Sequence, residues 1–479
     1  MPGILLQELQ RDGDPDTPGS GGFLTPSAGC SATEVVLKSR RAVGMNARVL
    51  NSNSGRGVMH LVPSRISGLV LNPISRRGRL SDSTPEWNLE MLPRSIDARK
   101  TLLKQVWTVG QLAGILMLLA GCGGSRSSPS APTFDFAVTD AVVEDFLAEA
   151  PGLDGASLII VHREWGVLHH RAFGSFDQDR ISLVASSSKV ITAGILNRLA
   201  DDGLLDLQQP LEDFLGWEST FSGVTTADLI SNSSGLVGLL PNLTFEPYMC
   251  QWRATGTLLD CGKSIFTATE AAPEVIPRQT AFRYGGGQWQ VAGAVAEAVS
   301  GKSWERLFEE IYEVPCGLTA SGFSNPFDGD PLSNLLSYPA QFDGDPGNLP
   351  QTRNPSMEAG LYTTSGDYGK LLLMQLRGGR CGENFVMSAN AVEQMQANQI
   401  DLAWGGKTES LWAGYGYGWW VDTERDGWLT DPGAFGAVPW LDLPRGYGAM
   451  IIVEANIGLG SALGDAVLPS IEAAIDNPS

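Results

Sequence analysis

Residues 186–217 have the sequence SSSKVITAGILNRLADDGLLDLQQPLEDFLGW. Apolar residues recur at helical spacing as far as Leu199, which predicts a helix that begins near Ser186. Because residues three apart lie on one helix face, the Ser186 hydroxyl and the Lys189 amine are expected within hydrogen-bond distance. The pair predicts a serine nucleophile with a lysine base. A helix-capping serine followed by a surface lysine is the alternative for these four residues.

Histidine, the usual base for a serine nucleophile, is scarce in this chain. Its four histidines are His60, His162, His169 and His170, and the last three fall in or beside an early predicted hairpin, on a solvated strand face. The chain also lacks the G-x-S-x-G turn of another hydrolase class. Lys189 enters an apolar helix, where burial and the helix dipole are expected to favour a partly neutral amine that accepts a proton.

Further motifs follow in order along the chain. They are Thr192 in S-x-x-K-x-x-T, the turn at 202–207, TADLISNSSG at 226–235, FRYGG at 282–286, AGLYTT at 359–364 and YGYGWW at 415–420. Together they resemble the serine β-lactamase and penicillin-binding-protein-like family, especially its class C and esterase branch, over residues 135–475. The resemblance implies an α+β fold of the β-lactamase/transpeptidase type, with an antiparallel sheet flanked by helices and an inserted, mainly helical region.

The resemblance also implies a Tyr-x-Asn element whose tyrosine shares proton transfer with the lysine. Tyr284 is the matching residue, with a buried structural aromatic as the alternative. Gly286 stands in place of the asparagine, which removes a side-chain amide that in the family holds substrate and orders the lysine. Asn232 stands where the family has a histidine in the L-L-x-H-x-S-G stretch.

A third family element, Lys-Thr-Gly or His-x-Gly, is best matched by DPGAFG at residues 431–436. Gly433 lets a substrate approach the strand, and the Ala434 N–H is expected to form the oxyanion hole with the Ser186 N–H. Asp431 replaces the family's cation, so a substrate carboxylate would be repelled. We therefore expect a neutral or cationic ester or amide rather than a penicillin. The candidates for apolar pocket walls are Trp252, Trp289, Trp419 and Trp440, although tryptophans are more often core.

The pattern of elements predicts a sheet built from both ends of the chain. Residues 135–150 are spaced as a helix, residues 156–173 as two strands around the turn at 162–166, and residues 414–420 and 446–456 as strands. Most helical patterns lie between residues 190 and 400, and a C-terminal helix is expected near 466–475. This arrangement makes residues 135–479 one split domain.

The charge distribution separates this domain from the part of the chain before it. Residues 1–121 hold 14 basic and 9 acidic residues, a charge of +5, whereas residues 122–479 hold 19 and 44, a charge of −25. So acidic a surface, without a basic stripe, excludes nucleic acid as an expected partner. Residues 1–90 are rich in Gly, Ser, Arg and Pro and are expected to be disordered or a mis-assigned extension, with Met91 as the natural start.

Residues 91–121 have the pattern of a signal peptide, with basic residues before the apolar run 106–120. The ending Leu119-Ala120-Gly121-Cys122 resembles the bacterial lipobox, which implies cleavage before Cys122 and a palmitate-type lipid anchor on it. A buried helix that happens to end in cysteine is the alternative. Residues 122–134 are a predicted flexible tether. We expect an exported lipoprotein in the cell envelope, at the outer membrane and facing the periplasm.

Four cysteines remain in the exported part, an even number in an oxidising compartment. Their three pairings all stay open in principle. We expect Cys250 with Cys261, which are close enough to close a short loop, and Cys316 with Cys381. No spacing of cysteines predicts zinc, and no motif requires a metal or a cofactor.

These observations favour a serine hydrolase that forms an acyl-enzyme on Ser186. The expected partner is a small ester or amide, with carboxylesterase and D-amino-acid amidase or cell-wall peptidase activities as the candidate types. The alternative is a lipoprotein with the same fold that binds a ligand without turnover, because Asn232, Gly286 and Asp431 all depart from the family pattern.

Overall fold

The computed structural model describes residues 132–217, 223–239, 242–268, 274–327, 329, 337–400 and 413–479. The predicted extension, the signal peptide, Cys122 and nearly all of the tether lie outside these residues. Among the described residues, no helix is both long and apolar enough to cross a bilayer.

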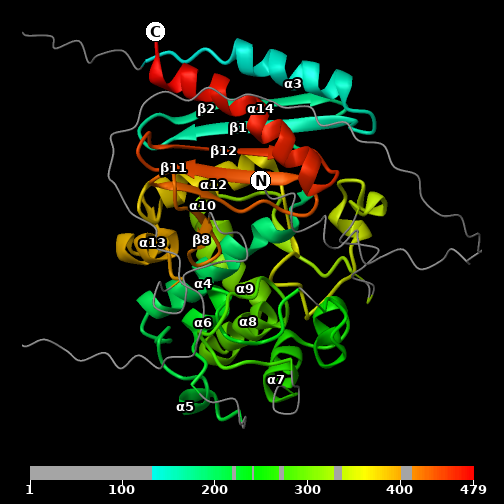
Figure 1. The fold of residues 1–479 in the computed structure, drawn as a ribbon, viewed down its shortest axis with the longest axis vertical. Coiled ribbons are helices and arrows are strands. Elements are labelled where there is room, and N and C mark those ends of the chain that lie inside the picture. The colour runs from blue at the N-terminus through cyan, green and yellow to red at the C-terminus, as the bar shows by residue number, and fades with distance from the viewer. Residues whose placement is uncertain are drawn as a thin grey trace, which may run out of the picture. The chain divides into compact units, whose positions relative to one another are not determined.

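The central sheet is built from both ends of the chain, as the sequence predicts (Figure 1). Its seven antiparallel strands have the order β2-β1-β12-β11-β10-β9-β8. They are β1 (Gly155–His162), β2 (Gly166–Gly174), β8 (Ala413–Tyr415), β9 (Trp420–Asp422), β10 (Trp428–Thr430), β11 (Ala437–Asp442) and β12 (Tyr447–Ile452). The early hairpin β1–β2 joins the C-terminal strands through the pairing of β1 with β12.

Both faces of the sheet are buried, each against its own helices. In β1, Leu158 and Ile160 belong to the core beneath α3 (Ala137–Glu149) and α14 (Ile457–Asp476), whereas Ile159 and Val161 belong to the core on the opposite side. This alternation follows from the two-residue period of a strand. Figure 1 shows α3 and α14 on the outer face and α12 (Ser365–Leu376) beneath the sheet.

The predicted helices at both ends are present, but α14 begins at Ile457, earlier than expected. The Asn456 side chain caps it by accepting from the Leu459 N–H. Its first turns are rich in glycine, which weakens the sequence pattern of a helix. A Cβ at Gly460 would lie 2.6 Å from the Gly436 carbonyl oxygen, so close packing against the sheet requires this glycine.

The region between β2 and β8 is mainly helical, as predicted. Its helices are α4 (Lys189–Asp201), α5 (Glu212–Leu215), α6 (Thr226–Ile230), α7 (Leu258–Ala268), α8 (Gly287–Ser300), α9 (Trp304–Phe308), α10 (Val314–Cys316), α12 and α13 (Ala389–Gln396). Shorter helical turns are η2 (Ala185–Ser188), η3 (Glu246–Trp252), η5 (Glu309–Glu313), η6 (Ala340–Phe342) and η7 (Pro346–Asn348). Two small sheets complete it, β3 (Ser182–Leu183) with β5 (Leu361–Thr363) and β4 (Gly322–Phe323), and β6 (Arg380–Cys381) with β7 (Asn384–Phe385).

Both expected disulfides are present. Cys250 is bonded to Cys261, and Cys316 is bonded to Cys381. The first ties η3 to α7, and the second ties α10 to β6.

Candidate active site around Ser186

The turn that carries Ser186 has a backbone that its sequence does not favour by itself. Ala185 has φ of 45°, in the left-handed region where a residue with a Cβ is strained by about 1–3 kcal/mol. The Ser187 hydroxyl donates to the Asp431 carbonyl at 2.6 Å, and the Tyr368 hydroxyl donates to the Ser187 carbonyl at 2.9 Å. The Ser188 hydroxyl donates to the Ala185 carbonyl at 2.6 Å. Bonds to two neighbouring segments and one bond within the turn therefore hold it.

Ser186 and Lys189 make the contact that their spacing predicts. The Lys189 Nζ lies 3.1 Å from the Ser186 Oγ. Lys189 is the first residue of α4 and is fully buried, whereas Ser186 is partly exposed among buried neighbours. The alternative of a surface lysine is therefore wrong, and the hydroxyl is the member of the pair that a substrate can reach.

Tyr284 lies against the same lysine. The Lys189 Nζ is 4.6 Å from the centre of the Tyr284 ring, which stacks on Trp420 with ring centres 5.1 Å apart. Burial raises the pKa of the Tyr284 hydroxyl, and the opposing effects of Lys189 and of a hydrogen bond with Ser186 do not cancel it. Tyr284 is therefore a neutral phenol in the resting site rather than a phenolate.

A buried carboxylate that the sequence analysis missed completes the surroundings of the lysine. The Glu358 Oε2 lies 3.2 Å from the Lys189 Nζ, and the Glu358 carbonyl oxygen accepts from the same Nζ at 3.2 Å. Both carboxylate oxygens also accept from the Gly286 N–H, at 3.1 and 3.0 Å. Glu358 is 3% exposed, so this ion pair is shielded from water.

Because of this contact, Lys189 is not the partly neutral amine that the sequence predicts. Burial favours the neutral amine, as the sequence analysis argued, but the acidic groups around it, of which Glu358 contacts the amine directly, outweigh burial and raise the pKa of Lys189. The pKa of Glu358 is also raised, because its burial outweighs the stabilising effects of Lys189 and the Gly286 N–H. The resting pair is an ammonium beside a carboxylate whose affinity for a proton is increased.

The segment after β10 packs against the nucleophile turn. A Cβ at Gly433 would lie 2.0 Å from the Val184 carbonyl oxygen, so only glycine fits at this position. Ala434, the next residue, is partly exposed, and no backbone carbonyl of the described residues accepts its N–H. Asp431 is fully buried, and neither carboxylate oxygen makes a hydrogen bond of normal geometry with a donor of the described residues.

Burial raises the pKa of Asp431 well above its ordinary value, against the opposing influence of Lys189 and the Val190 N–H. Asp431 lies close enough to Lys189, Tyr284 and Tyr368 to affect their pKa values as well. A protonated carboxyl would not repel a substrate carboxylate, which modifies the expected repulsion. The site still lacks the cation that the resemblance led us to expect there.

Asn232 is a buried residue whose hydrogen bonds support the site. Its Oδ1 accepts from the Gly285 N–H at 3.0 Å, the Gln288 Nε2 at 3.1 Å and the Trp289 Nε1 at 2.9 Å. These bonds fix the loop that carries Tyr284 to the start of α8. Asn232 has φ of 58°, a left-handed conformation that asparagine tolerates better than most residues.

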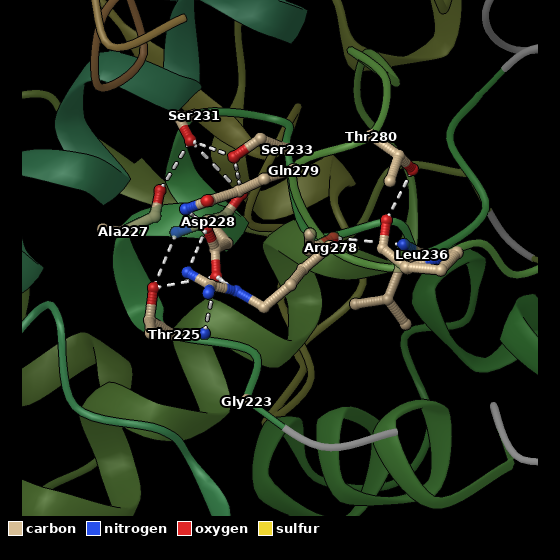
Figure 2. A network of polar contacts seen from close by, with 12 residues as sticks. Gly223, Thr225, Ala227, Asp228, Ser231, Ser233, Leu236, Arg278, Gln279 and Thr280 are labelled. Atoms are coloured by element: carbon tan, nitrogen blue, oxygen red, sulfur yellow. Dashed lines mark hydrogen bonds and ion pairs between the residues drawn. The ribbon is translucent and has the colours of Figure 1, made fainter. Parts of the chain in front are cut away.

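A network around Asp228 holds the segment that contains Asn232. Figure 2 shows the Asp228 carboxylate between Thr225 on one side and Arg278 with Gln279 on the other. It accepts from the Thr225 N–H at 2.9 Å, from the Arg278 Nε at 2.5 Å and from the Gln279 Nε2 at 2.9 Å. Thr225 and Asp228 also form the capping box of α6. The network anchors a loop that has little regular structure of its own.

The candidate wall tryptophans are core residues instead. Trp252, Trp289, Trp419 and Trp440 are each at most 2% exposed. Trp440 packs beneath α14, on the opposite side of the sheet from Ser186. Trp420, which the sequence analysis did not select, is the partly exposed tryptophan that stacks on Tyr284.

The described histidines belong to the β1–β2 hairpin, as expected. The His169 Nε2 lies 2.7 Å from Asp140 on α3, and the His170 Nε2 lies 2.9 Å from Ser365 at the start of α12. Within the described ranges, no group of three or more His, Cys, Asp or Glu side chains is arranged to hold a metal ion.

The structure thus gathers Ser186, Lys189, Tyr284 and the 431–434 segment, and adds two residues. Trp420 lies within the quoted YGYGWW motif, but nothing in the motif distinguishes it from Trp419. Glu358 had one usable signal, since it is a single acidic residue in the otherwise uncharged stretch PSMEAGLYTT.

Comparison with known proteins identifies the family and the fold. The family model described as Beta-lactamase matches residues 139–468. Penicillin-binding protein 4 of Amycolatopsis lactamdurans is 24% identical over 315 residues, which cover 62% of this chain and 77% of that protein. The esterase/β-lactamase LipL of Mycobacterium tuberculosis is 27% identical over 175 residues, covering 34% of this chain and 35% of LipL. A penicillin-binding protein homologue from Caulobacter crescentus shares the fold, with a TM-score of 0.57 at 18% identity, covering 72% of this chain and 99% of that structure.

Proposed function

Because the chain belongs to the β-lactamase family, whose members are generally serine hydrolases, we propose that it forms an acyl-enzyme on Ser186 from an ester or amide. The observation that carries this proposal is the partly exposed Ser186 hydroxyl, 3.1 Å from a fully buried lysine. An exposed nucleophile beside a shielded base is the arrangement that covalent catalysis requires.

The proposed chemistry has two halves. Once Lys189 has given up its resting proton, its amine takes the hydroxyl proton as Ser186 attacks the carbonyl carbon, and Tyr284 passes a proton to the leaving group. The Ser186 and Ala434 N–H groups stabilise the negative oxygen of the tetrahedral intermediate. The free Ala434 N–H supports this role. Water then releases the acyl group by the same steps in reverse.

The substrate class follows from the surroundings of the serine. Penicillins carry a carboxylate, and the position where the family supplies a cation for it is occupied by the buried acid Asp431. The stacked rings of Tyr284 and Trp420 offer an aromatic surface beside the nucleophile. We therefore propose a neutral or cationic ester or amide, of the carboxylesterase or D-amino-acid amidase type, which agrees with the esterase named among the relatives.

A binding protein without turnover is the second candidate, favoured by the departures at Asn232, Gly286 and Asp431. Two of these departures have structural explanations: the Asn232 Oδ1 accepts three hydrogen bonds, and the Gly286 N–H bonds to Glu358. A buried ion pair on the lysine would have no evident use in a protein that only binds. The hydrolase is therefore the preferred proposal.

Intact-mass spectrometry of the full chain tests it, after incubation with a fluorophosphonate or with a penicillin. We expect a fluorophosphonate adduct that maps to Ser186 and disappears in Ser186→Ala and Lys189→Ala, with much slower labelling by penicillin. Ser188→Ala, a neighbouring serine whose hydroxyl bonds within the turn, should still be labelled. No adduct on a folded parent would favour the binding protein.

A further inference from the structure

Glu358 contacts the same lysine atom as the nucleophile. The Lys189 Nζ lies 3.1 Å from the Ser186 Oγ and 3.2 Å from the Glu358 Oε2. One ammonium group therefore touches both a hydroxyl and a carboxylate, and of the three residues only Ser186 is partly exposed.

The backbone of the neighbouring loop is shaped around this carboxylate. Gly286 has φ of 80° and ψ of −164°, a conformation essentially restricted to glycine. A Cβ at Gly286 would lie 2.7 Å from the Val237 carbonyl oxygen, so an asparagine cannot take this position without moving the backbone. The Gly286 N–H, at the start of the fourteen-residue helix α8, instead points to Glu358. The missing amide and the extra carboxylate are thus one coupled change.

We propose that Glu358 is the proton acceptor that turns Lys189 into a base for Ser186. This inference rests on the proposed acyl-enzyme function and adds a component to it. Glu358 acts through Lys189 and does not contact the substrate, so it is a positioning and proton-holding residue rather than a catalytic one.

The proton accounting is balanced without any further reactant. The resting ammonium transfers one proton to the Glu358 carboxylate, which leaves a neutral amine and a neutral carboxyl. The amine then takes the Ser186 proton as the oxygen attacks the carbonyl carbon, and the ammonium is restored. When the leaving group departs, Tyr284 supplies its proton and is reprotonated from Lys189, and Glu358 returns its proton to the amine.

Other charged and titratable groups face this pair from each element around it. They are Tyr284 in the loop before α8, Tyr415 on β8 and Asp431 after β10. Asp431 and Tyr284 both act on the pKa of Lys189 in the same direction as Glu358. Removing Glu358 would therefore leave the buried lysine without the carboxylate that contacts it and without an acceptor for its proton.

Glu358→Gln is the decisive variant, because glutamine has nearly the same shape and its carbonyl oxygen can still accept from the Gly286 N–H. We expect ester hydrolysis at pH 7 to fall by about 100-fold, the range of one proton-transfer residue. The acid limb of kcat/KM should move upward by more than one pH unit, since the lysine must now lose its proton to solvent. In the parent, that limb reports protonation of the coupled pair.

Glu358→Asp separates proton acceptance from packing. It keeps a carboxylate but draws it back by one methylene, so we expect a smaller loss, about 10-fold, with the acid limb in the parent's range. A purely structural role predicts the reverse order, with the isosteric Gln variant more active than the Asp variant. If the Gln variant does not fold, the Asp variant alone decides. An acid limb of kcat/KM that moves to higher pH, or activity equal to that of the parent, would then overturn the proposal.

Asp442→Asn is the matched control, since Asp442 is a buried carboxylate paired with Arg425 and Arg445 at the far end of β11. It should keep the parent's pH profile. If the parent hydrolyses no ester and takes no fluorophosphonate, the proposed function itself has failed. If the parent is active but Glu358→Gln keeps its acid limb, only the role of Glu358 is wrong.

Discussion

Asp431 lowers the stability of the folded state, because its neighbours do not compensate for the burial of its carboxyl group. A carboxyl group buried without a hydrogen-bond partner normally loses its charge, because an isolated charge in a protein interior is unfavourable. Its raised pKa means that the folded protein holds this proton at pH values where the unfolded chain has released it. The contribution of Asp431 to stability therefore decreases as pH rises above the ordinary value of 3.8.

Asp431→Asn should remove this dependence, because an amide does not titrate. Near pH 4 the variant and the parent should have similar free energies of unfolding. The advantage of the variant should then grow by about 1.4 kcal/mol for each pH unit until the folded-state pKa is reached. Urea unfolding at pH 4, 5.5 and 7 measures it, and an advantage that is the same at all three pH values would contradict the burial argument.

The roles of individual site residues could be predicted from the sequence where a motif contains those residues. The spacing of Ser186 and Lys189 requires only one helical turn, so their contact followed from sequence. Glu358 could not be predicted, because its role depends on a contact with α4 across 169 residues of chain. The sign of the lysine pKa change was wrong for the same reason, since burial was visible in the sequence and the contact with the Glu358 carboxylate was not.

Hydrogen bonds and an ion pair, and not apolar packing alone, position the segment from α6 to Asn232. The Asp228 carboxylate accepts hydrogen bonds from Thr225 at the start of this segment and from the turn at residues 278–279, and Asp228 is 2% exposed (Figure 2). Because Asn232 in turn bonds the loop of Tyr284, damage at Asp228 should be transmitted to the site.

We expect Asp228→Ala to lower the free energy of unfolding by about 3–5 kcal/mol, since it leaves the partly buried Arg278 without its partner. Asp202→Ala is the control, because Asp202 forms an exposed pair with Arg198 one helical turn away. That change should cost less than about 1 kcal/mol. Equal losses in the two variants, measured by denaturant unfolding, would mean that the network contributes no more than a surface pair.

The two disulfides should contribute unequally to stability. Cys250 and Cys261 are 11 residues apart, whereas Cys316 and Cys381 are 65 residues apart. In the chain-entropy model, the longer loop restricts the unfolded chain by about 1.5 kcal/mol more. Replacing each pair with serines and comparing urea unfolding tests this expectation. A greater loss from the Cys250–Cys261 pair would show that local packing, and not loop length, sets the contribution.

The elements that the sequence predicted best are those with a clear period. Strands β1 and β12 alternate between two buried faces, and α4 repeats its apolar residues, so both types were identified. The short strands β9 and β10 have three residues each, too few for a period to appear. Their place in the sheet depends on pairing with β11, a tertiary contact that local sequence does not contain.

The whole chain is best explained as an exported and anchored enzyme, which we propose from its sequence and disulfides. Two disulfides persist in an oxidising compartment and are uncommon in a reducing one. The excess of acidic over basic residues lies after Cys122, whereas Arg99, Lys100 and Lys104 precede the apolar run that would direct export. Export therefore accounts for the cysteines and for the charge division together.

Lipidation at Cys122 is the part of this proposal that can be tested directly. Expressed in a bacterium with radiolabelled palmitate, the full chain should carry label and sediment with membranes. Cys122→Ala should lose the label and retain the precursor segment, because cleavage requires the modified cysteine. Cys250→Ser, which removes a disulfide cysteine, should keep the label and so controls for the loss of a thiol. An unlabelled parent whose mature N-terminus lies elsewhere would refute the anchor, yet the chemistry proposed for Ser186 would stand, since every group it uses lies after residue 184.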